Sequence, residues 1–319
     1  YRLGFTVIGA FIINSEYRYN GEILSKPTTI FVVDHHYDEV NGIWPLQQLL
    51  DNSKCDPYSH TLLFDMNLHD DIFVKYNPLC IPYCCTWLFD EFEKENIVPE
   101  WTNKTKTFNF MINKPRLHRI RLLELVEQLN LTNYTYSLPW QENPYTSLPV
   151  TNYMIGTETQ MPQGIRSGSI RNSQSYKQLL QKAVFEPSCI SLITEPTYVE
   201  KEALIDEKTI MAIYGGTIPI WVGGWRYADA MKELGFDVFD DLVDHSYQFL
   251  EDPIERTDKS IELNLDLLSS FTMTPQILER LQHNLDLMLD GVFEKQVEKQ
   301  LRDTNFTLSR DHAGLCIVE

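Results

Sequence analysis

The sequence predicts an α/β protein whose larger part is a doubly wound parallel sheet. Between residues 107 and 239, short β-branched runs alternate with segments of helical period, and this cadence is typical of strand–helix–strand units with parallel strands. The first hundred residues instead hold short apolar runs with irregular connections. Since a chain of 319 residues suggests about two domains, we expect one domain over 1–103 and a second over 104–319.

The first domain is expected to contain short strands, each ended by polar residues. The predicted strands are FTVIGAFII (5–13), TTIFVVDHH (28–36) and HTLLFDMN (60–67). The turn-prone stretch PEWTNKTK (99–106) follows them. We interpret this stretch as the linker between the two domains.

The second domain is expected to alternate strictly and to end in helices. The predicted strands are 107–112, 134–138, 189–194, 217–222 and the short DVF at 237–239, and the predicted helices are 115–129, 173–184, 206–214 and 227–234. Two long amphipathic helices near 246–269 and 274–303 end the chain. Ligands of such sheets bind beyond the carboxyl ends of the strands. We therefore expect a site in the loops at 113–119, 194–208 and 223–227.

Charge and hydropathy exclude several classes of partner. A formal net charge of −18 argues against nucleic acid or an anionic membrane as the main partner. It leaves room for a small anionic ligand held by a local basic cluster. No apolar run approaches the ~18–20 residues of a membrane-spanning helix, so none is expected. Because the sequence begins at Tyr1 and not at a methionine, we expect it to be trimmed, and an upstream signal or anchor would not be visible.

The cysteines indicate a reducing, cytosol-like compartment. They are sparse, form no CxxC pair and lack the histidine spacing of a zinc site; they are Cys55, Cys80, Cys84, Cys85, Cys189 and Cys316. Four sequons would suit a secreted protein, but such triplets arise by chance in chains rich in Asn and Thr; they lie at Asn103, Asn130, Asn133 and Asn305. We expect a cytoplasmic protein in preference to one of the secretory lumen.

Two predicted helices begin with cations, where the helix dipole disfavours them. Lys208 falls in the first turn of helix 206–214, at a cost of ~0.3–1 kcal/mol for an exposed group. Either it is a solvated lysine whose charge Asp206 and Glu207 offset, or an anion faces it. Helix 115–129 repeats the anomaly, with Pro115 suited to its first position and with Lys114, Arg116, His118 and Arg119 around its start. A phosphate would explain both starts; the alternative is a basic surface patch paired with acidic neighbours.

Carboxylates beside these cations point to hydroxyl groups. Glu195 ends the strand CISLITE, and Glu207 directly precedes Lys208. A carboxylate near a phosphate would repel it unless it binds ribose or sugar hydroxyls, although Glu207 could equally be an ordinary first-turn acid. Gly223 and Gly224 would let backbone approach a ligand, or form a plain turn. No P-loop, GxGxxG or convincing DxD metal motif is present.

At this point the residues resemble a known family. ITE (193–195), DEK (206–208) and AIYGGTIPIWVGG (212–224) are similar to the α-1,3-fucosyltransferase signature, in which a strand ending in Glu-Asn precedes a Thr-Glu-Lys helix start and an A-G-x-x-P-V/I strand. The stretch 234–256 resembles glycosyltransferase-like sequences of large DNA viruses and phages, and 108–126 resembles the arginine-bearing segment of both groups. Together these stretches cover nearly all of the second domain.

The resemblance implies the GT-B fold, in which two Rossmann-like domains face a cleft and the C-terminal one holds the donor. It implies that Lys208 contacts the donor diphosphate, Glu207 the ribose, and Arg116 or Arg119 a phosphate. The remaining donor-binding candidates are Glu195, Asn113, His118 and Gly223. Pro196 stands where fucosyltransferases have Asn, and the gap between Glu195 and Glu207 is longer. The donor therefore stays open between a GDP-sugar such as GDP-fucose and a UDP-sugar.

The catalytic base is expected from the first domain, across the cleft from the donor. VVDHHYDE (32–39) is the densest candidate and offers Asp34, His35, His36 and Asp38; Glu16, Asp70 and Asp71 come next. We expect an inverting, metal-independent transferase without a cofactor, acting on a glycan or small-molecule hydroxyl. The alternative is a non-catalytic module that binds a sugar nucleotide. A phosphatase or epimerase would lack its aspartyl nucleophile or dinucleotide loop here.

Overall fold

The computed structural model of the chain describes a well-defined C-terminal sheet with its helices and several shorter pieces. The described residues are 31–33, 62–64, 67–68, 79–80, 98–101, 104–112, 116–139, 153–157, 165–167, 180–195, 202–203, 205–301, 307–311 and 314–318.

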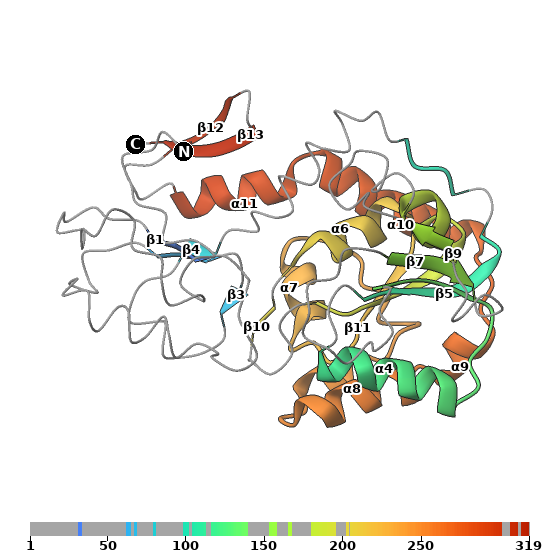
Figure 1. Ribbon diagram of the computed structural model, residues 1–319. Helices are drawn as coiled ribbons and strands as arrows, with labels where there is room; N and C mark the ends of the chain where they lie inside the picture. Colours follow the sequence, from blue (N-terminus) through green and yellow to red (C-terminus); the bar gives the residue numbers. More distant parts are fainter. Residues whose placement is uncertain are drawn as a thin grey trace.

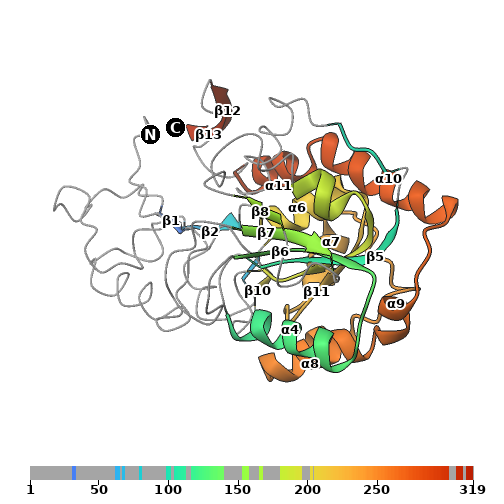
Figure 2. The same ribbon diagram turned by 45° about the vertical axis from the view of Figure 1, so that its right-hand side comes forward.

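A six-stranded sheet in the order β11-β9-β5-β6-β7-β8 forms the centre of this part (Figures 1 and 2). Its first four strands are parallel: β11 (Ile218–Trp221), β9 (Ser188–Ile193), β5 (Lys106–Met111) and β6 (Tyr134–Pro139). These strands confirm the predicted α/β class with its parallel sheet. The antiparallel strands β7 (Tyr153–Thr157) and β8 (Ile165–Ser167) extend the sheet beyond β6 and were not predicted from the sequence.

The sheet is wound in both directions from its middle. The chain leaves β5 through helix α4 (Leu117–Gln128) to reach β6, and it leaves β9 through helix α6 (Glu207–Tyr214) to reach β11 on the other side. Figure 1 shows α4 and α6 on opposite faces of the sheet. The neighbouring carboxyl ends of β5 and β9 therefore form the topological switch point, where doubly wound sheets bind their ligands.

Two hydrophobic cores, one on each face, hold these layers together. On the α6 face, Met111 and Trp221 of the sheet pack with Met211 of α6. On the α4 face, Phe108 and Phe110 pack with Leu122, Leu125 and Val126 of α4 and with Ile190 and Ile220. Successive strand residues point to opposite faces, so strands that are buried on both faces read as continuous apolar runs. This explains why the sequence located them.

The predicted strand at 237–239 is not present. The segment after helix α7 (Tyr227–Glu233) is irregular. The side-chain amide of Asn284 satisfies the backbone of Asp237, accepting from its N–H at 2.7 Å and donating to its carbonyl at 2.7 Å. The Asp237 carboxylate accepts from the N–H of Phe239 at 2.8 Å, and Phe239 adopts a positive φ of 63°. A side chain from another element thus replaces the strand partner.

The two long terminal helices predicted at 246–269 and 274–303 are each broken. The first consists of a 3-10 turn η4 (Ser246–Phe249), α8 (Pro253–Glu262) and α9 (Leu265–Ser269). Asp252 caps α8 by accepting from the N–H groups of Ile254 and Glu255, and proline at the first position favours a new start there. The second consists of α10 (Pro275–Leu289) and α11 (Val292–Leu301), separated by Gly291 at φ +75°.

Other predicted elements are described only in part. Of the helix expected at 173–184, the structure describes its end, where the π-helix η3 (Gln181–Phe185) lies. Of the linker expected at 99–106, Trp101 Nε1 donates to the Tyr214 carbonyl at 3.0 Å and Lys104 Nζ donates to the Gly215 carbonyl. These two side chains fasten the segment before β5 to the carboxyl end of α6.

The described pieces of the first hundred residues include a second, smaller parallel sheet. It has the order β1-β2-β4, with β1 (Phe31–Val33), β2 (Leu62–Phe64) and β4 (Leu79–Cys80). β1 and β2 fall inside the strands predicted at 28–36 and 60–67, whereas the strand predicted at 5–13 lies outside the described residues. A short antiparallel ladder joins β3 (Asn67–Leu68) to β10 (Glu202–Ala203), and a hairpin of β12 (Thr307–Asp311) and β13 (Gly314–Val318) follows α11.

Candidate functional site

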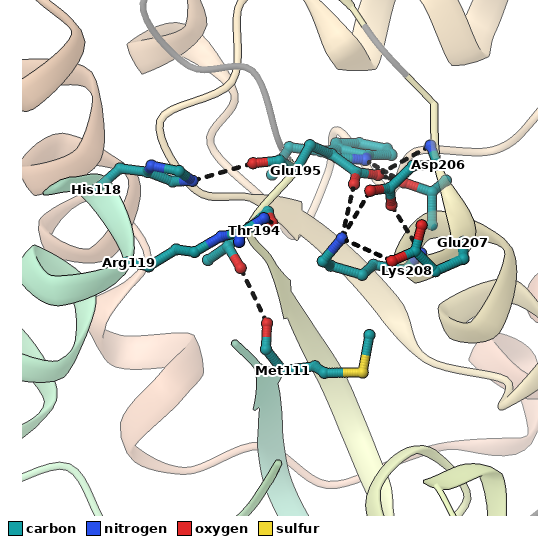
Figure 3. A network of polar contacts seen from close by, with 10 residues as sticks. Met111, His118, Arg119, Thr194, Glu195, Asp206, Glu207 and Lys208 are labelled. Atoms are coloured by element: carbon teal, nitrogen blue, oxygen red, sulfur yellow. Dashed lines mark hydrogen bonds and ion pairs between the residues drawn. The ribbon is translucent and has the colours of Figure 1, made fainter. Parts of the chain in front are cut away.

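The candidate site lies at the switch point, where α4 and α6 begin beside the ends of β5 and β9 (Figure 3). The Thr194 hydroxyl donates to the Met111 carbonyl at 3.0 Å and so ties the two strand ends together. Two side chains of the first turn of α4 reach the same segment: Arg119 donates to the Thr194 carbonyl at 2.8 Å, and His118 Nε2 lies 3.0 Å from the Glu195 carbonyl. The start of α4 is thus fixed to the residues that follow β9.

Lys208 is surrounded by carboxylates of its own chain. Asp206 caps α6 by accepting from the N–H of Lys208 at 2.9 Å, and its second oxygen lies 2.6 Å from Lys208 Nζ. Glu207 Oε1 is 3.2 Å from the same nitrogen, and Glu195 Oε2 is 3.7 Å away. Only 3% of the Lys208 side chain is exposed. The cation is therefore buried and paired, which rules out the solvated surface lysine that the sequence left open.

Burial and charge act in opposite directions on the groups of this cluster. Burial alone lowers the pKa of Lys208, but the charges of Asp206, Glu207 and Glu195 raise it above its ordinary value. Burial alone raises the pKa of Asp206, but the charge of Lys208 lowers it well below its ordinary range. Lys208 and Asp206 therefore form an ion pair at neutral pH. Removing only one partner of such a buried pair strongly destabilises the folded protein, because the other charge is left buried and unpaired.

Glu195 has a different role from the other two carboxylates. Its Oε1 accepts from the Thr209 hydroxyl at 2.5 Å and from the N–H of Asp206 at 3.4 Å. Trp221 Nε1 in turn donates to the Thr209 hydroxyl at 3.0 Å. Burial, together with the charge of Asp206, raises the pKa of Glu195 well above its ordinary value. The Glu195 carboxyl group therefore favours its neutral form. Through Thr209 it connects the end of β9 with the first turn of α6 and with β11.

The start of α4 is basic, and the acidic groups that act on Arg119, among them Asp206 and Glu207, belong to the α6 cluster and not to α4. Arg116 is the N-cap residue in an extended conformation, so the helix begins at Leu117, two residues later than the predicted start at Pro115. Among the described residues, no side chain caps α4 and its first turn contains no acid. Arg116 is half-buried, whereas Arg119 and His118 are 2% and 0% exposed. Arg116 is thus the arginine of this turn that reaches solvent.

His118 contributes no charge at neutral pH, and Arg119 contributes one. Burial, followed by the charges of Arg119 and Arg116, lowers the pKa of His118 well below its ordinary value. Burial and the charge of Arg116 lower the pKa of Arg119 to about 10. The α4 start therefore carries two guanidinium charges and a neutral imidazole. This is the composition of an anion-binding helix start.

Gly223 brings the end of a third strand to the site. It follows β11 at φ +72°, and a Cβ there would lie 2.6 Å from Thr257 Oγ1 and 3.6 Å from the Cβ of His118. Its carbonyl accepts from Arg256 Nε at 3.0 Å. Protein atoms thus fill the space beside its Cα, and the glycine allows β11 and α8 to pack closely against the start of α4.

The structure brings together most of the donor-binding residues that the sequence predicted. Lys208, Glu207, Glu195, Arg119 and His118 lie in one network, with Arg116 and Gly223 beside it. Asn113 lies outside the described residues, as do the predicted base candidates Asp34, His35, His36 and Asp38 and the runners-up Glu16, Asp70 and Asp71.

Thr194, Thr209 and Trp221 were not predicted from the sequence, and Asp206 was considered there as a charge that offsets a solvated Lys208. Thr209 lies three residues after the cap, a spacing that places both side chains on one side of the first turn, so it could have been noticed. Nothing in the local sequence distinguishes Trp221 from an ordinary core residue. Its indole donor needs a buried acceptor, and only the fold shows that Thr209 supplies it.

A cavity of about 450 Å³ lies outside this network, between α7 and residues 240–249. Its lining includes four aspartates, Asp229, Asp240, Asp241 and Asp244. Three of them are in ion pairs: Asp240 with Lys232 at 2.8 Å, Asp229 with Arg226 at 2.9 Å and Asp241 with Arg280 at 2.7 Å. The cavity shares no lining residue with the Lys208 cluster.

In the part of the chain that the structure describes, no three His, Cys, Asp or Glu side chains are grouped so as to hold a metal ion. None of the helices that the structure describes has the length and apolar character needed to span a membrane.

Comparison with known proteins adds no relative. No protein-family model, no curated protein and no solved structure matches this chain.

Proposed function

We propose that this protein is a glycosyltransferase that takes a sugar from a nucleoside-diphosphate sugar and has the two-domain GT-B arrangement. One observation carries the proposal: two helices that begin at the switch point of a doubly wound sheet both present cations in their first turns. Arg116 and Arg119 lie on α4 and Lys208 on α6. The sequence resemblance to α-1,3-fucosyltransferases assigns donor-phosphate contacts to the same residues.

The α4 start suits the diphosphate because it combines the N-terminus of a helix with the guanidinium groups of Arg116 and Arg119. Its backbone N–H groups and the Arg116 guanidinium face the anion together, and each charge-assisted hydrogen bond to phosphate contributes about 1.5–3 kcal/mol. In sugar transfer the diphosphate is the leaving group, and its negative charge grows as the glycosidic bond breaks. Positive groups held in place before the reaction stabilise that charge in the transition state.

Glu207 and Lys208 complete the donor site on the α6 side. The Glu207 side chain is 31% exposed, in contrast to the 3% of Lys208, so it is the carboxylate of the cluster that a ribose hydroxyl can reach. When Glu207 turns toward the ribose, Lys208 loses one of its carboxylate partners and gains a phosphate oxygen in exchange. The donor favoured by the resemblance is a GDP-sugar such as GDP-fucose, with a UDP-sugar as the alternative.

The acceptor half of the reaction rests on the first part of the chain. A base is needed to take the proton of a glycan or small-molecule hydroxyl as the sugar is transferred with inversion, and such assistance is typically worth ~10²–10⁴-fold in rate. The segment 32–39, with Asp34, His35, His36 and Asp38, remains the predicted source of this base. Because arginines and a lysine are placed to neutralise the diphosphate, we expect the reaction to need no metal ion.

The proposal is tested by donor binding followed by turnover. Thermal unfolding of the intact chain with GDP, UDP, CMP and dTDP should single out one nucleotide, because a ligand at a hundredfold excess over its Kd stabilises the native state by ~2.7 kcal/mol. The matching nucleotide sugar should then be consumed in the presence of EDTA. Binding without transfer or hydrolysis would favour a non-catalytic module, whereas activity lost to EDTA and restored by Mn²⁺ would contradict the metal-independent mechanism.

A further inference from the structure

We infer that Glu195 is a positioning residue, whose carboxyl group holds the first turn of α6 so that Lys208 occupies one fixed place beside the switch point. The inference rests on the proposed function, because it assigns Glu195 no ligand contact and gives it the task of presenting Lys208 to the donor phosphate. It differs from the role that the sequence suggested for Glu195, which was a direct contact with a hydroxyl group of the donor.

The hydrogen bonds of Glu195 run to the helix and not toward solvent. Its Oε1 accepts from the side chain of Thr209 at 2.5 Å and from the backbone of Asp206 at 3.4 Å. These residues flank Lys208 on both sides in the sequence. The Glu195 side chain is 2% exposed, and it fixes the start of α6 from within the protein. Asp206 holds the Lys208 ammonium group at 2.6 Å.

The same contacts join three elements of the sheet. Glu195 follows β9, Thr209 belongs to α6, and Trp221 ends β11 and donates to the Thr209 hydroxyl at 3.0 Å. The Trp221 ring is 1% exposed and stacks on Tyr227 of α7 with centroids 6.0 Å apart. A hydroxyl that donates to Glu195 and accepts from Trp221 has one fixed orientation. The first turn of α6 therefore has little freedom to rotate.

An acceptor in its neutral form is sufficient for this task. Asp206 already supplies the negative charge closest to Lys208, at 2.6 Å compared with 3.7 Å for Glu195. A second buried carboxylate beside Asp206 is disfavoured by burial and by like charge, in agreement with the raised pKa of Glu195. A glutamine has the same shape and offers the same acceptor oxygen. Glu195→Gln should therefore preserve the position of Lys208, and Glu195→Ala should lose it.

The test measures Lys208 directly, by acetylation of the folded protein and mass spectrometry of its peptides. Lys232 and Lys259 are internal references, because their side chains are 41% and 43% exposed. Lys208 should be protected from acetylation, relative to these references, in the native protein and in Glu195→Gln. It should be acetylated at least tenfold faster in Glu195→Ala and in Thr209→Val, which removes the connecting hydroxyl while keeping a similar shape.

The affinity for GDP and UDP, measured on the same four proteins, gives the functional consequence. Loss of a charge-assisted hydrogen bond to phosphate corresponds to ~10–100-fold in affinity, so the preferred nucleotide should bind that much more weakly to Glu195→Ala and equally well to Glu195→Gln. A purely structural residue would lower the melting temperature without changing the ratio of acetylation at Lys208 to that at Lys232. Equal protection of Lys208 in all four proteins overturns the inference, as does a Gln variant that behaves like the Ala variant.

Two safeguards keep this test separate from the proposed function. If Glu195→Ala does not fold, Thr209→Val and Glu195→Gln still give opposite expectations, and equal protection of Lys208 in these two overturns the inference. If neither nucleotide binds the native protein, the proposed function fails, while the acetylation pattern still decides whether Glu195 holds Lys208 in place.

Discussion

The starts of α4 and α6 are two solutions to one electrostatic problem. Both helices follow a central strand of the sheet, and both carry cations where the helix dipole is positive. At α6 the chain supplies its own anions, because the Asp206 and Glu207 carboxylates lie 2.6 Å and 3.2 Å from Lys208 Nζ, and the Glu195 carboxyl group lies 3.7 Å from it. At α4 the described residues of the first turn include no acid and no side-chain cap. Without a ligand, Lys208 is already paired within the protein, whereas the α4 start is of the kind that binds an anion.

This difference predicts which cation matters more for the stability of the fold and which matters more for the binding of an anion. A compensated buried cation is tied to the fold, because its removal leaves buried carboxylates behind. A half-buried arginine at a helix start, such as Arg116, contributes less to the fold and more to the affinity for an anion. Variants of the Lys208 ion pair should therefore have their largest effect on stability, and the Arg116 variant should have its largest effect on nucleotide affinity.

The largest effect is expected at the buried ion pair. Asp206→Asn keeps a capping side chain but removes the charge beside Lys208, and Lys208→Met removes the cation beside Asp206. Each should lower the free energy of unfolding by about 3–5 kcal/mol, because an unpaired charge is left buried. Urea unfolding measures both changes. The double variant should recover about 1–3 kcal/mol of the summed loss, and strict additivity would contradict a direct pair. Lys232→Met, at a pair with 41% and 59% exposed side chains, is the control.

The two arginines at the start of α4 should differ in their effect on stability. Arg116→Ala should weaken nucleoside-diphosphate binding by about 1.5–3 kcal/mol and leave the unfolding transition nearly unchanged, because Arg116 is half-buried. Arg119→Ala should also destabilise the fold, because this 2% exposed guanidinium donates to the Thr194 carbonyl. Calorimetry and urea unfolding on both variants give the comparison. Should both keep the native affinity, the α4 start would be only a basic surface.

The pH dependence of stability should reveal the neutral form of Glu195. Its pKa is raised in the folded state, so above the unfolded value of about 4.3 the native state holds the extra proton and stability falls as pH rises. Glu195→Gln has no such proton. The stability of the variant relative to the native protein should therefore rise between pH 5 and 8, by up to about 1.4 kcal/mol per pH unit.

Two other groups with shifted pKa values, His118 and Asp206, do not alter this stability difference between pH 5 and 8. Because the pKa of His118 is lowered, this histidine makes the folded protein less stable as pH falls through the ordinary pKa of histidine. The effect is the same in both proteins and cancels in the difference between them. Asp206, whose pKa is also lowered, titrates below this range. A difference that is independent of pH would mean that Glu195 is already ionised in the native state.

The smallest effect is expected at an exposed charge cluster. Arg280 of α10 holds Asp237 at 2.6 Å and Asp241 at 2.7 Å, with side chains about one-third to two-thirds exposed. Water screens such pairs, so Arg280→Met should cost only about 1 kcal/mol. The hydrogen bonds of Arg280 lower the pKa of Asp241, so this contribution should disappear as pH falls below about 4. A loss as large as that of Asp206→Asn would show that burial does not decide the outcome at α6.

The sequence predicted the parallel sheet because its strands are buried on both faces and therefore read as continuous apolar runs. The sequence also revealed the two cationic helix starts, because the order of the residues places a lysine or an arginine in a predicted first turn. It could not find what depends on distant partners. The amide of Asn284 replaces a strand at Asp237, Gly291 breaks an apolar pattern that continues across it, and Trp221 reaches Thr209 only in the folded chain. Nor could it show whether Lys208 faced a ligand or its own carboxylates.

The most direct test of the central claim, that the switch point between β5 and β9 binds a diphosphate, is calorimetric titration of GDP and UDP into three proteins. These are the native chain, Arg116→Ala, and Arg121→Ala as the matched control on the same helix, where Arg121 is held by Asp258 at 2.6 Å. We predict that one nucleotide binds the native and control proteins equally and binds Arg116→Ala about tenfold or more weakly. Equal affinity of all three proteins, or no binding of either nucleotide to the native chain, would contradict the account.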